Sequence, residues 1–353
     1  TLLSLVRLRD KDLLSDSEYS RLATSYQFLR HLEHRLQLAE DRQTHALPEK
    51  PEDLALVSRK MPAPLMGNDP SSENLLRQLN LHFEHVQEVY ERVIHAQQPL
   101  YYTQSPMPPP GVVEGDELPE RAGVASTNLM RFLDQRAPAL AAAVTRARLG
   151  RSQAAFEHFL EMVLRNQDWV DALNTDAVLC GYLLDLFQHS PYFAEQLVRH
   201  PTYIEEIRGM RARGLSATNY SEVMPLIDDV NELRRYYLRQ MFRIELESIC
   251  LVPAVFQTLA RTSELSDAVI EACYRLSVNR TLETLKPESA GYSPSDQMMV
   301  GALGRLGMYE FDLGSDADLV FIIPDQDLQE LRFWTRVAER LITTLASYTG
   351  DGV

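Results

Sequence analysis

Apolar residues recur at three- and four-residue steps through much of the first hundred residues, a pattern that predicts long amphipathic helices. One helix is expected over residues 18–41, capped by Ser15 or Ser17. Its expected buried stripe is Leu22, Tyr26, Leu29, Leu32 and Leu36. A second helix is expected over residues 73–95, within a helical domain that spans residues 1–96. Its expected buried stripe is Leu75, Leu76, Leu79, Phe83, Val86, Tyr90 and Val93.

Residues 97–125 interrupt this pattern with a high density of proline and glycine. Pro108, Pro109 and Pro110 are consecutive, which excludes a helix interior and favours extended polyproline geometry. We therefore predict a linker here, followed by a second helical region over residues 126–288. Within that region, helices are expected over residues 152–166, 176–189, 191–200, 229–250 and 263–284.

The pattern changes again in residues 289–353. Residues 297–303 form a short apolar segment, predicted as a first strand, that ends in Gly304-Arg305-Leu306-Gly307. Residues 319–323 are all apolar and rich in β-branched and aromatic side chains, which predicts a buried strand. Residues 327–347 predict an amphipathic helix. Its expected inward side chains are Leu331, Trp334, Val337, Leu341, Ile342 and Leu345. The predicted fold is therefore mainly α, with two helical-bundle regions followed by the truncated start of an α/β domain.

Charge and composition argue against several function classes. The chain has 50 acidic and 35 basic residues, which gives a formal net charge of −15. Nucleic acids and anionic membranes are bound by basic surfaces, so neither is expected as a partner. No apolar run approaches the roughly 18 residues that a transmembrane helix needs. Cys180, Cys250 and Cys273 form no disulfide or zinc pattern, which favours burial and a cytoplasmic location.

Two carboxylates stand at the entrance of the predicted strand. Asp316 and Asp318 are two residues apart, and in an extended chain such side chains point to the same face. Like charges this close repel each other, and a divalent cation such as Mg²⁺ held by the carboxylate oxygens relieves the repulsion. The glycine-bearing connection before them would let backbone approach a phosphate. A polar turn that caps the start of a strand explains the same residues without a metal.

The sequence around this pair resembles the nucleotidyltransferase superfamily of the DNA polymerase β type. The signature of that superfamily is an apolar residue, Gly and Gly or Ser, a spacer, and Asp-x-Asp entering a strand. A closer similarity is to the active-site motif of bifunctional glutamine synthetase adenylyltransferase/adenylyl-removing enzymes. It is carried by Ala302-Leu303-Gly304-Arg305-Leu306-Gly307, then Glu310, then Ser315-Asp316-Ala317-Asp318-Leu319-Val320-Phe321. Met308 stands where that family usually has a second glycine, and Phe311 stands where leucine is common.

Other segments carry the same resemblance. The helical domain that follows a catalytic core in this family is similar to Tyr26-Gln27-Phe28-Leu29-Arg30, Glu33-His34-Arg35-Leu36-Gln37 and Asp41-Arg42-Gln43-Thr44-His45-Ala46-Leu47-Pro48. The helical lead-in to the next core is similar to Ser190-Pro191-Tyr192-Phe193-Ala194, Leu197-Val198-Arg199-His200-Pro201 and Leu233-Arg234-Arg235-Tyr236. The order implies the end of a first half over residues 1–96, the linker, and the lead-in of a second half. An incomplete nucleotidyltransferase core would then occupy residues 289–353.

The resemblance implies that this second half transfers AMP from ATP to a tyrosine of glutamine synthetase, while the other half removes AMP by phosphorolysis. Mg²⁺ is the implied cofactor, and glutamine synthetase and a PII signalling protein are the implied partners. Asp316 and Asp318 are implied to be catalytic and to hold the metal. The implied phosphate-binding residues are Gly307, Met308 and Ser315. A third carboxylate is expected beyond Val353, so this chain by itself is expected to be inactive.

Two other polar groups have competing explanations. Arg235, Arg239 and Arg243 share a helix face and would meet the triphosphate or an acidic protein surface. The favoured alternative is a solvated face whose ion-pair partners are Glu232, Glu245 and Glu247. The run Arg42-Gln43-Thr44-His45 is expected to end a helix through local hydrogen bonds rather than to reach nucleotide. For the whole chain, the alternative to an enzyme is a catalytically silent helical scaffold or regulatory adaptor with a degenerate α/β end.

Overall fold

The fold is that of a computed structural model, which describes residues 2–40, 44, 46–95, 133–147, 149, 152–215 and 218–346. The described chain is mainly α-helical with a two-stranded sheet near its end, which confirms the predicted fold class. The predicted linker over residues 97–125 lies outside the described residues, as do Arg42, Gln43 and His45. None of the helices that the structure describes has the length and apolar character needed to cross a bilayer.

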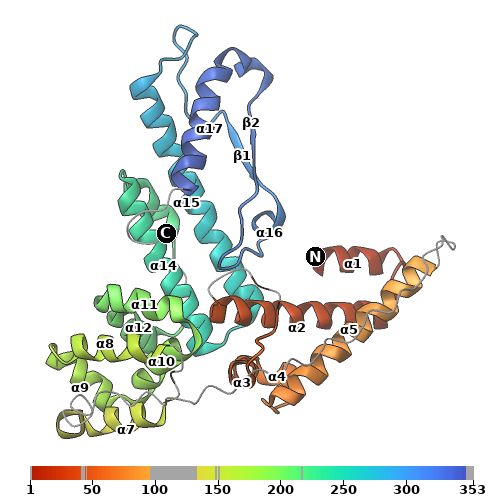
Figure 1. Cartoon of the computed structure of the whole chain (residues 1–353). Coiled ribbons are helices and arrows are strands. Elements are labelled where there is room, and N and C mark those ends of the chain that lie inside the picture. Colours follow the sequence, from red (N-terminus) through yellow and green to blue (C-terminus); the bar gives the residue numbers. More distant parts are fainter. Residues whose placement is uncertain are drawn as a thin grey trace.

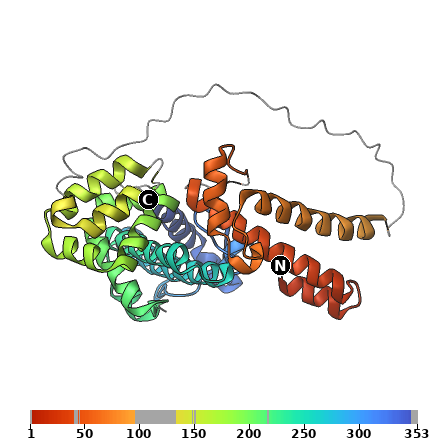
Figure 2. The ribbon, with the colours of Figure 1, turned by 90° about the horizontal axis from the view of Figure 1, so that it is seen from below.

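The N-terminal helices form an arm that extends from the rest of the molecule, as Figure 1 and Figure 2 show. The arm contains α1 (Leu2–Asp10), α2 (Asp16–Glu40), α3 (Pro51–Lys60), α4 (Ala63–Met66) and α5 (Ser72–His95). Of these, α2 and α5 confirm the two predicted helices. Ser15 caps α2: its hydroxyl accepts from the Glu18 N–H at 3.3 Å, and the Glu18 carboxylate accepts from the Ser15 N–H at 2.8 Å.

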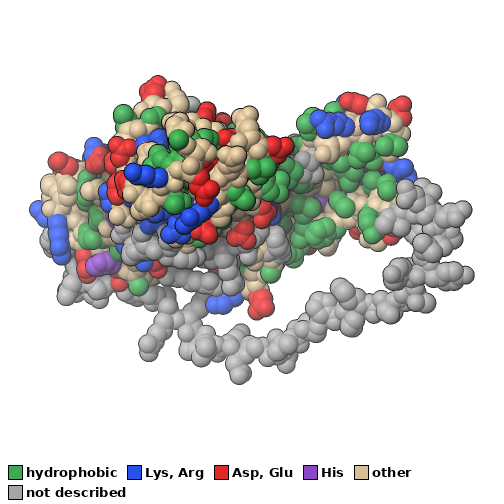
Figure 3. All heavy atoms as spheres, turned by 90° about the horizontal axis from the view of Figure 1, so that it is seen from above, with side chains coloured by type: hydrophobic (Ala, Val, Ile, Leu, Met, Phe, Trp, Pro, Cys, Tyr) green, Lys and Arg blue, Asp and Glu red, His purple; other side chains and the backbone are tan. Residues whose placement is uncertain are grey.

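The predicted buried stripe of α5 is mostly wrong. Leu75 and Leu79 are buried, but five of its members are exposed: Leu76, Phe83, Val86, Tyr90 and Val93. The reason is that α5 carries two adjacent apolar rows. α2, together with α3 and α4, packs against α5 on the side of Leu75, Leu79 and Val89, whereas the side chains of the other row are exposed. Hydrophobic side chains are accordingly visible on the surface of the arm in Figure 3.

The central region is a helical bundle around one large hydrophobic core. Its elements are α7 (Pro138–Arg146), α8 (Gln153–Val163), α9 (Gln167–Thr175), α10 (Ala177–His189), α11 (Pro191–Arg199), η2 (Pro201–Tyr203), α12 (Ile204–Arg213), α13 (Tyr220–Val223), η3 (Met224–Leu226), α14 (Val230–Leu251) and α15 (Val255–Thr284). Several begin at a side chain that accepts backbone N–H bonds: Asn166, Asp176, Ser190 and Asp229. Cys180 and Cys273 are buried and Cys250 is partly buried, all as free thiols.

Five of these helices, α8, α10, α11, α14 and α15, match the five predicted ones to within a few residues, apart from the start of α15. The others were not predicted individually. α15 begins at Val255 rather than at residue 263, and it includes a run of polar residues. The hydroxyls of Thr262, Ser263 and Ser266 each donate to the carbonyl four residues earlier, at 3.0, 2.8 and 2.9 Å. Because these hydroxyls find acceptors inside the helix, the polar run does not interrupt it.

The buried side of α2 also differs from the prediction. Leu32 and Leu36 are buried, whereas Leu22, Tyr26 and Leu29 are only partly buried. Polar side chains on the same helix are buried instead: Ser25, Arg30, His31, His34, Arg35 and Gln37. The reason is that α2 packs against α5 on one side and against α11 and α15 on others, so more than one of its faces is covered.

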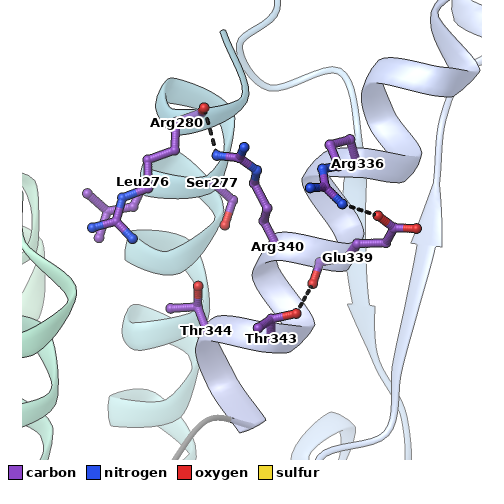
Figure 4. Close-up of a pocket in the computed structure, with 8 residues that line it drawn as sticks. All are labelled: Leu276, Ser277, Arg280, Arg336, Glu339, Arg340, Thr343 and Thr344. Carbon is purple, nitrogen blue, oxygen red and sulfur yellow. Dashed lines mark hydrogen bonds and ion pairs between the residues drawn. The ribbon is translucent and has the colours of Figure 1, made fainter. Parts of the chain in front are cut away.

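The last described part is a small α/β unit. It contains β1 (Met299–Ala302), α16 (Gly304–Gly307), β2 (Leu319–Ile322), η4 (Asp325–Glu330) and α17 (Leu331–Ala346). The two strands are antiparallel, with Met299 opposite Ile322 and Ala302 opposite Leu319. α17 packs along α15, and Arg340 ties the two helices by donating to the Arg280 carbonyl at 2.7 Å (Figure 4).

The expected burial of β2 and α17 is only half correct. Leu319 and Phe321 are partly buried on the helix side, whereas Val320 and Ile322 are 37% and 49% exposed. Trp334, Val337 and Leu341 are buried in α17 as predicted. The other three predicted inward residues are exposed: Leu331, Ile342 and Leu345. Among the described residues, helices cover one face of the sheet only, so alternate strand residues remain accessible.

Candidate active site

The carboxylate pair lies in the extended segment that leads directly into β2. Asp316 and Asp318 are both exposed, and the Asp318 carbonyl accepts from the Leu303 N–H at 2.8 Å, which joins this segment to the end of β1. Both side chains line the same cavity, of about 640 Å³. Within the described part of the chain, neither carboxylate forms an ion pair. Two unpaired carboxylates that face one cavity are the donor set that a hard divalent cation prefers.

At each glycine of α16, a different feature of the backbone disfavours a side chain. Gly304 has a φ of +57°, which favours glycine, and a Cβ there would lie 3.1 Å from Asp318 Oδ2. Gly304 therefore lets the Asp318 carboxylate lie directly over the backbone. A Cβ at Gly307 would collide with the backbone carbonyl of Ala302. Gly307 thus allows α16 to fold tightly against the end of β1, whether or not a phosphate binds there.

The three residues implied to bind phosphate are not brought to one place. Ser315 lines the cavity of the carboxylate pair, and its hydroxyl accepts from Arg305 at 3.4 Å. Gly307 lines a different cavity, of about 470 Å³, on the side of α15 that carries Asp267. The Gly307 and Met308 N–H groups already donate within α16, to the carbonyls of Leu303 at 3.1 Å and Gly304 at 3.2 Å. Met308 has a φ of −95°, so its position does not require glycine.

The cavity beside the carboxylate pair is lined by α14, α15, β2 and α17. Its wall is largely apolar, with Leu233, Val269, Ile270 and Phe321 among the lining side chains. Arg234 is the basic group among the described lining residues, and it donates to the Thr344 carbonyl at 2.9 Å. The volume falls in the range of about 300–1,000 Å³ that is usual for small-molecule sites. An apolar wall with one arginine near two carboxylates suits a ligand with both a flat apolar part and an anionic part.

The predicted partners of the α14 arginines are wrong. Arg239 donates to Glu206 of α12 at 2.6 Å, and Arg243 pairs with the same carboxylate. Arg235 and Arg239 line a separate cavity, of about 360 Å³, together with His200 and Tyr203. The expected partners Glu245 and Glu247 point elsewhere, because Glu247 pairs with Arg261 and Glu245 is fully buried against α2. Arg234, which sequence reasoning did not select, is the member of this run that reaches the carboxylate cavity.

A buried polar cluster connects α2 to the site, and sequence reasoning missed it. His34 Nδ1 lies 2.8 Å from Asp312 Oδ1, and its Nε2 lies 2.8 Å from the Ser248 hydroxyl. Glu245 is fully buried 3.7 Å from His34 Nε2, and neither of its oxygens accepts a hydrogen bond from the described residues. Arg35 donates to the Ser248 carbonyl at 3.1 Å. No local spacing signals this cluster, because its members come from three separate parts of the chain.

Burial and charge set the protonation of this cluster. Burial raises the pKa of Glu245 to about 7. Burial also works to raise the pKa of Asp312, but the His34 ring and hydrogen bonds to the carboxylate outweigh it, so that the pKa lies below its usual value. Burial lowers the pKa of Arg35 to about 10, against the attraction of Glu245 and Asp312. His34, Glu245 and Asp312 are metal-ligand types within 4.8 Å of one another. Arg35 supplies a positive charge to the two carboxylates without a metal.

Comparisons with known proteins fit this geometry. A family model described as glutamate-ammonia ligase adenylyltransferase matches residues 180–353, which include the carboxylate pair and α14. A second family model, described as GlnD PII-uridylyltransferase, matches residues 1–94, which form the arm.

Curated relatives align with nearly the whole chain. It is 26% identical over 414 residues to the bifunctional glutamine synthetase adenylyltransferase/adenylyl-removing enzyme of Thioalkalivibrio sulfidiphilus, which covers 99% of this chain and 41% of that protein. It is 26% identical over 393 residues to the enzyme of the same description from Ralstonia nicotianae, covering 98% of this chain and 39% of that protein. The chain thus spans about two fifths of the length of these relatives. The chain is therefore similar to the glutamate-ammonia ligase adenylyltransferase family over residues 180–353, and distantly similar to these relatives over nearly its whole length.

Proposed function

We propose that this chain belongs to a protein that transfers AMP from ATP to a tyrosine of glutamine synthetase, with residues 126–353 part of the adenylylating half. The observation that carries the proposal is the pair Asp316 and Asp318. These carboxylates are unpaired among the described residues and face a cavity large enough for a nucleotide, and Asp318 lies beside Gly304. The other half of the full protein would remove AMP, as the names of the relatives suggest; the family resemblance implies that it does so by phosphorolysis.

The residues fit Mg²⁺ as the cofactor. Asp316 and Asp318 offer hard oxygen ligands, and no described cation neutralises them. Mg²⁺ bound there would neutralise developing charge on the phosphates of ATP. In the transfer, the tyrosine oxygen bonds to the α-phosphorus and pyrophosphate leaves. Arg234 would bind the phosphates within the cavity, the apolar wall would receive the adenine ring, and Ser315 would hold the segment before the pair. A PII signalling protein is the proposed regulatory partner.

Substitution of the pair tests this function. In the full-length protein that contains this chain, Asp316→Asn or Asp318→Asn is expected to abolish AMP transfer while AMP removal continues. Each change removes one metal ligand, and a bound metal contributes several kcal/mol of charge stabilisation in phosphoryl transfer. The measurement is transfer of labelled AMP to glutamine synthetase, with AMP release measured on the same preparations. Asp325→Asn, an exposed carboxylate at the other end of β2, is the matched control and should retain both activities.

The same variants separate the enzyme from a silent scaffold. Removing one charge relieves repulsion, so the melting temperature without metal should hold or rise slightly. Mg²⁺ with ATP should raise the melting temperature of the parent protein but not that of the Asp316→Asn variant, because a ligand stabilises only what it binds. Near-normal transfer by Asp316→Asn would instead support a scaffold whose α/β end has no catalytic role.

A further inference from the structure

The site loop, residues 308–318 between α16 and β2, carries the carboxylate pair and has no regular secondary structure. Its first part is nevertheless buried: Glu310 and Phe311 are 8% exposed and Asp312 is 1% exposed. Buried loop groups need hydrogen-bond partners, because an unpaired buried polar group is costly. α15 supplies one such partner, since Ser263 Oγ accepts from the Phe311 N–H at 3.1 Å.

Most of the other partners come from one face of α2. Arg30 donates to the Glu310 carbonyl at 3.1 Å, and the Tyr26 hydroxyl contacts the Glu310 carboxylate. His34 Nδ1 lies 2.8 Å from Asp312 Oδ1, and the Glu33 carboxylate accepts from Arg305 of α16 at 2.5 Å. Positions 26, 30, 33 and 34 of a helix share one face. Figure 1 shows the C-terminal part of α2 lying against α15.

His34 connects the loop to a rigid support. An ionised carboxylate only accepts hydrogen bonds, so His34 Nδ1 carries the proton that Asp312 accepts. The opposite nitrogen faces the Ser248 hydroxyl on α14 at 2.8 Å. A ring held on both sides in this way fixes Asp312 relative to α14, and Asp316 follows four residues later. Neither Arg30 nor His34 lines the cavity of the carboxylate pair, so any effect they have on it passes through the loop.

We infer that Arg30 and His34 are positioning residues that hold the site loop, so that AMP transfer in the second half requires α2 of the arm to be docked on it. The inference rests on the proposed function of the carboxylate pair. Its physical basis is that misplacing reacting groups by about 1 Å can lower a rate roughly a hundredfold. Docking of the arm is thereby a condition for a correctly placed metal site.

Two substitutions at His34 separate its two hydrogen bonds. Asn places its amide N–H near the position of Nδ1 and can still donate to Asp312, whereas Gln reaches the Nε2 side and cannot. In the full-length protein, His34→Gln is expected to lower AMP transfer roughly tenfold or more and to raise the Mg²⁺ concentration for half-maximal rate. His34→Asn should stay within roughly threefold of the parent. In an Asp312→Asn background, His34→Gln should cost little further rate, because the shared hydrogen bond is already changed.

Further variants distinguish a loss of loop positioning from a general loss of folding. Arg30→Lys keeps the charge but is too short to reach the Glu310 carbonyl, and it should lower transfer in the same direction as His34→Gln. Arg21→Gln is the control on α2, because Arg21 pairs with Glu88 at the exposed surface. Circular dichroism and melting temperature confirm that each variant is folded before rates are compared.

The results distinguish this inference from the proposed function. Loss of transfer in Asp316→Asn together with normal transfer and normal Mg²⁺ dependence in His34→Gln would overturn the positioning role alone. Equal losses in His34→Asn and His34→Gln, in folded protein and without a shift in Mg²⁺ dependence, would overturn it as well. Normal transfer in Asp316→Asn would overturn the proposed function, and the inference with it. A loss in His34→Gln that His34→Asn restores, with a shifted Mg²⁺ dependence, supports both.

Discussion

At the scale of single residues, buried charge decides how the site region responds to pH. Glu245 lies on α14 with His34 and Arg35 facing it from α2, Asp312 from the site loop and Arg261 from α15. Burial raises its pKa to about 7 from an ordinary value of 4.5, despite the attraction of the nearby basic groups. The native protein therefore keeps a proton on Glu245 at pH values where the unfolded chain has lost it. The contribution of Glu245 to the free energy of unfolding is fully present below about pH 4.5. It is lost as the pH rises through about 7.

Glu245→Gln tests this linkage because it removes the titration and keeps the shape. Relative to the parent, the free energy of unfolding of the variant should increase by roughly 1–3 kcal/mol between pH 5 and pH 8, since one pKa unit corresponds to about 1.4 kcal/mol. Urea unfolding at the two pH values measures it. Glu283→Gln, an exposed position on α15, should show no such difference between the two pH values. The same difference from the parent at both pH values for Glu245→Gln would contradict the argument.

The carboxylate pair and the buried cluster also show which residues the sequence reveals. Asp316 and Asp318 could be proposed from the sequence because their signal is local: two carboxylates at fixed spacing before an apolar strand. His34, Glu245 and Asp312 were not, because their contact depends on the packing of three distant segments. Arg234 was missed for a similar reason, since the i, i+4 spacing of its neighbours identifies a helix face but not the side that meets the cavity. Local spacing can therefore identify candidate site residues. Tertiary packing determines which other charged side chains lie next to them.

At the scale of elements, apolar periodicity located helices and strands but did not identify which face is covered. The strands β1 and β2, and the helices α2, α5, α14 and α17, lie close to their predicted positions. The exposed row of α5, the open face of β2 and both ends of α17 carry exposed apolar residues that the sequence pattern predicted to be buried. An amphipathic pattern reports that a face suits burial. Only the arrangement of neighbours shows whether a described element covers it.

The pairing between α14 and α12 gives a prediction at this scale. Glu206 is 5% exposed and accepts from both Arg239 and Arg243. The double variant Arg239→Gln/Arg243→Gln should lower the free energy of unfolding by about 1–3 kcal/mol, because it leaves a buried carboxylate without its cations. Arg235→Gln, on the same helix and exposed, should change it by less than about 0.5 kcal/mol. Equal effects in thermal unfolding would show that the three arginines form one solvated face after all.

At the scale of the whole molecule, the arm and the site loop are distant in sequence but share a buried interface. The arm has its own small hydrophobic core, around Phe28, Leu32 and Leu75, separate from the large core of the central region. Its contacts to the central region include the polar network of Arg30, His34 and Arg35 with Ser248 and Asp312. Such a network specifies one docking geometry, because any other leaves buried charges unpaired. The chain therefore has a defined way to place the arm against the site loop.

Cleavage between the two parts tests this docking directly. A specific protease site is introduced within residues 97–125, where the sequence predicts a linker, and the protein is cut under native conditions. The fragments carrying residues 1–95 and 133–346 should co-elute in size-exclusion chromatography, because α2 remains bound to α14, α15 and the site loop without the covalent connection. His34→Gln and Arg30→Lys should weaken the association, since each leaves a buried partner unsatisfied, whereas Arg21→Gln should not. Separation of the parent fragments at low protein concentration and moderate salt would mean that the polar network adds too little affinity to hold the arm in place. Retention of the fragments by His34→Gln at the parent level would mean that the apolar contacts of α2 hold the arm without it.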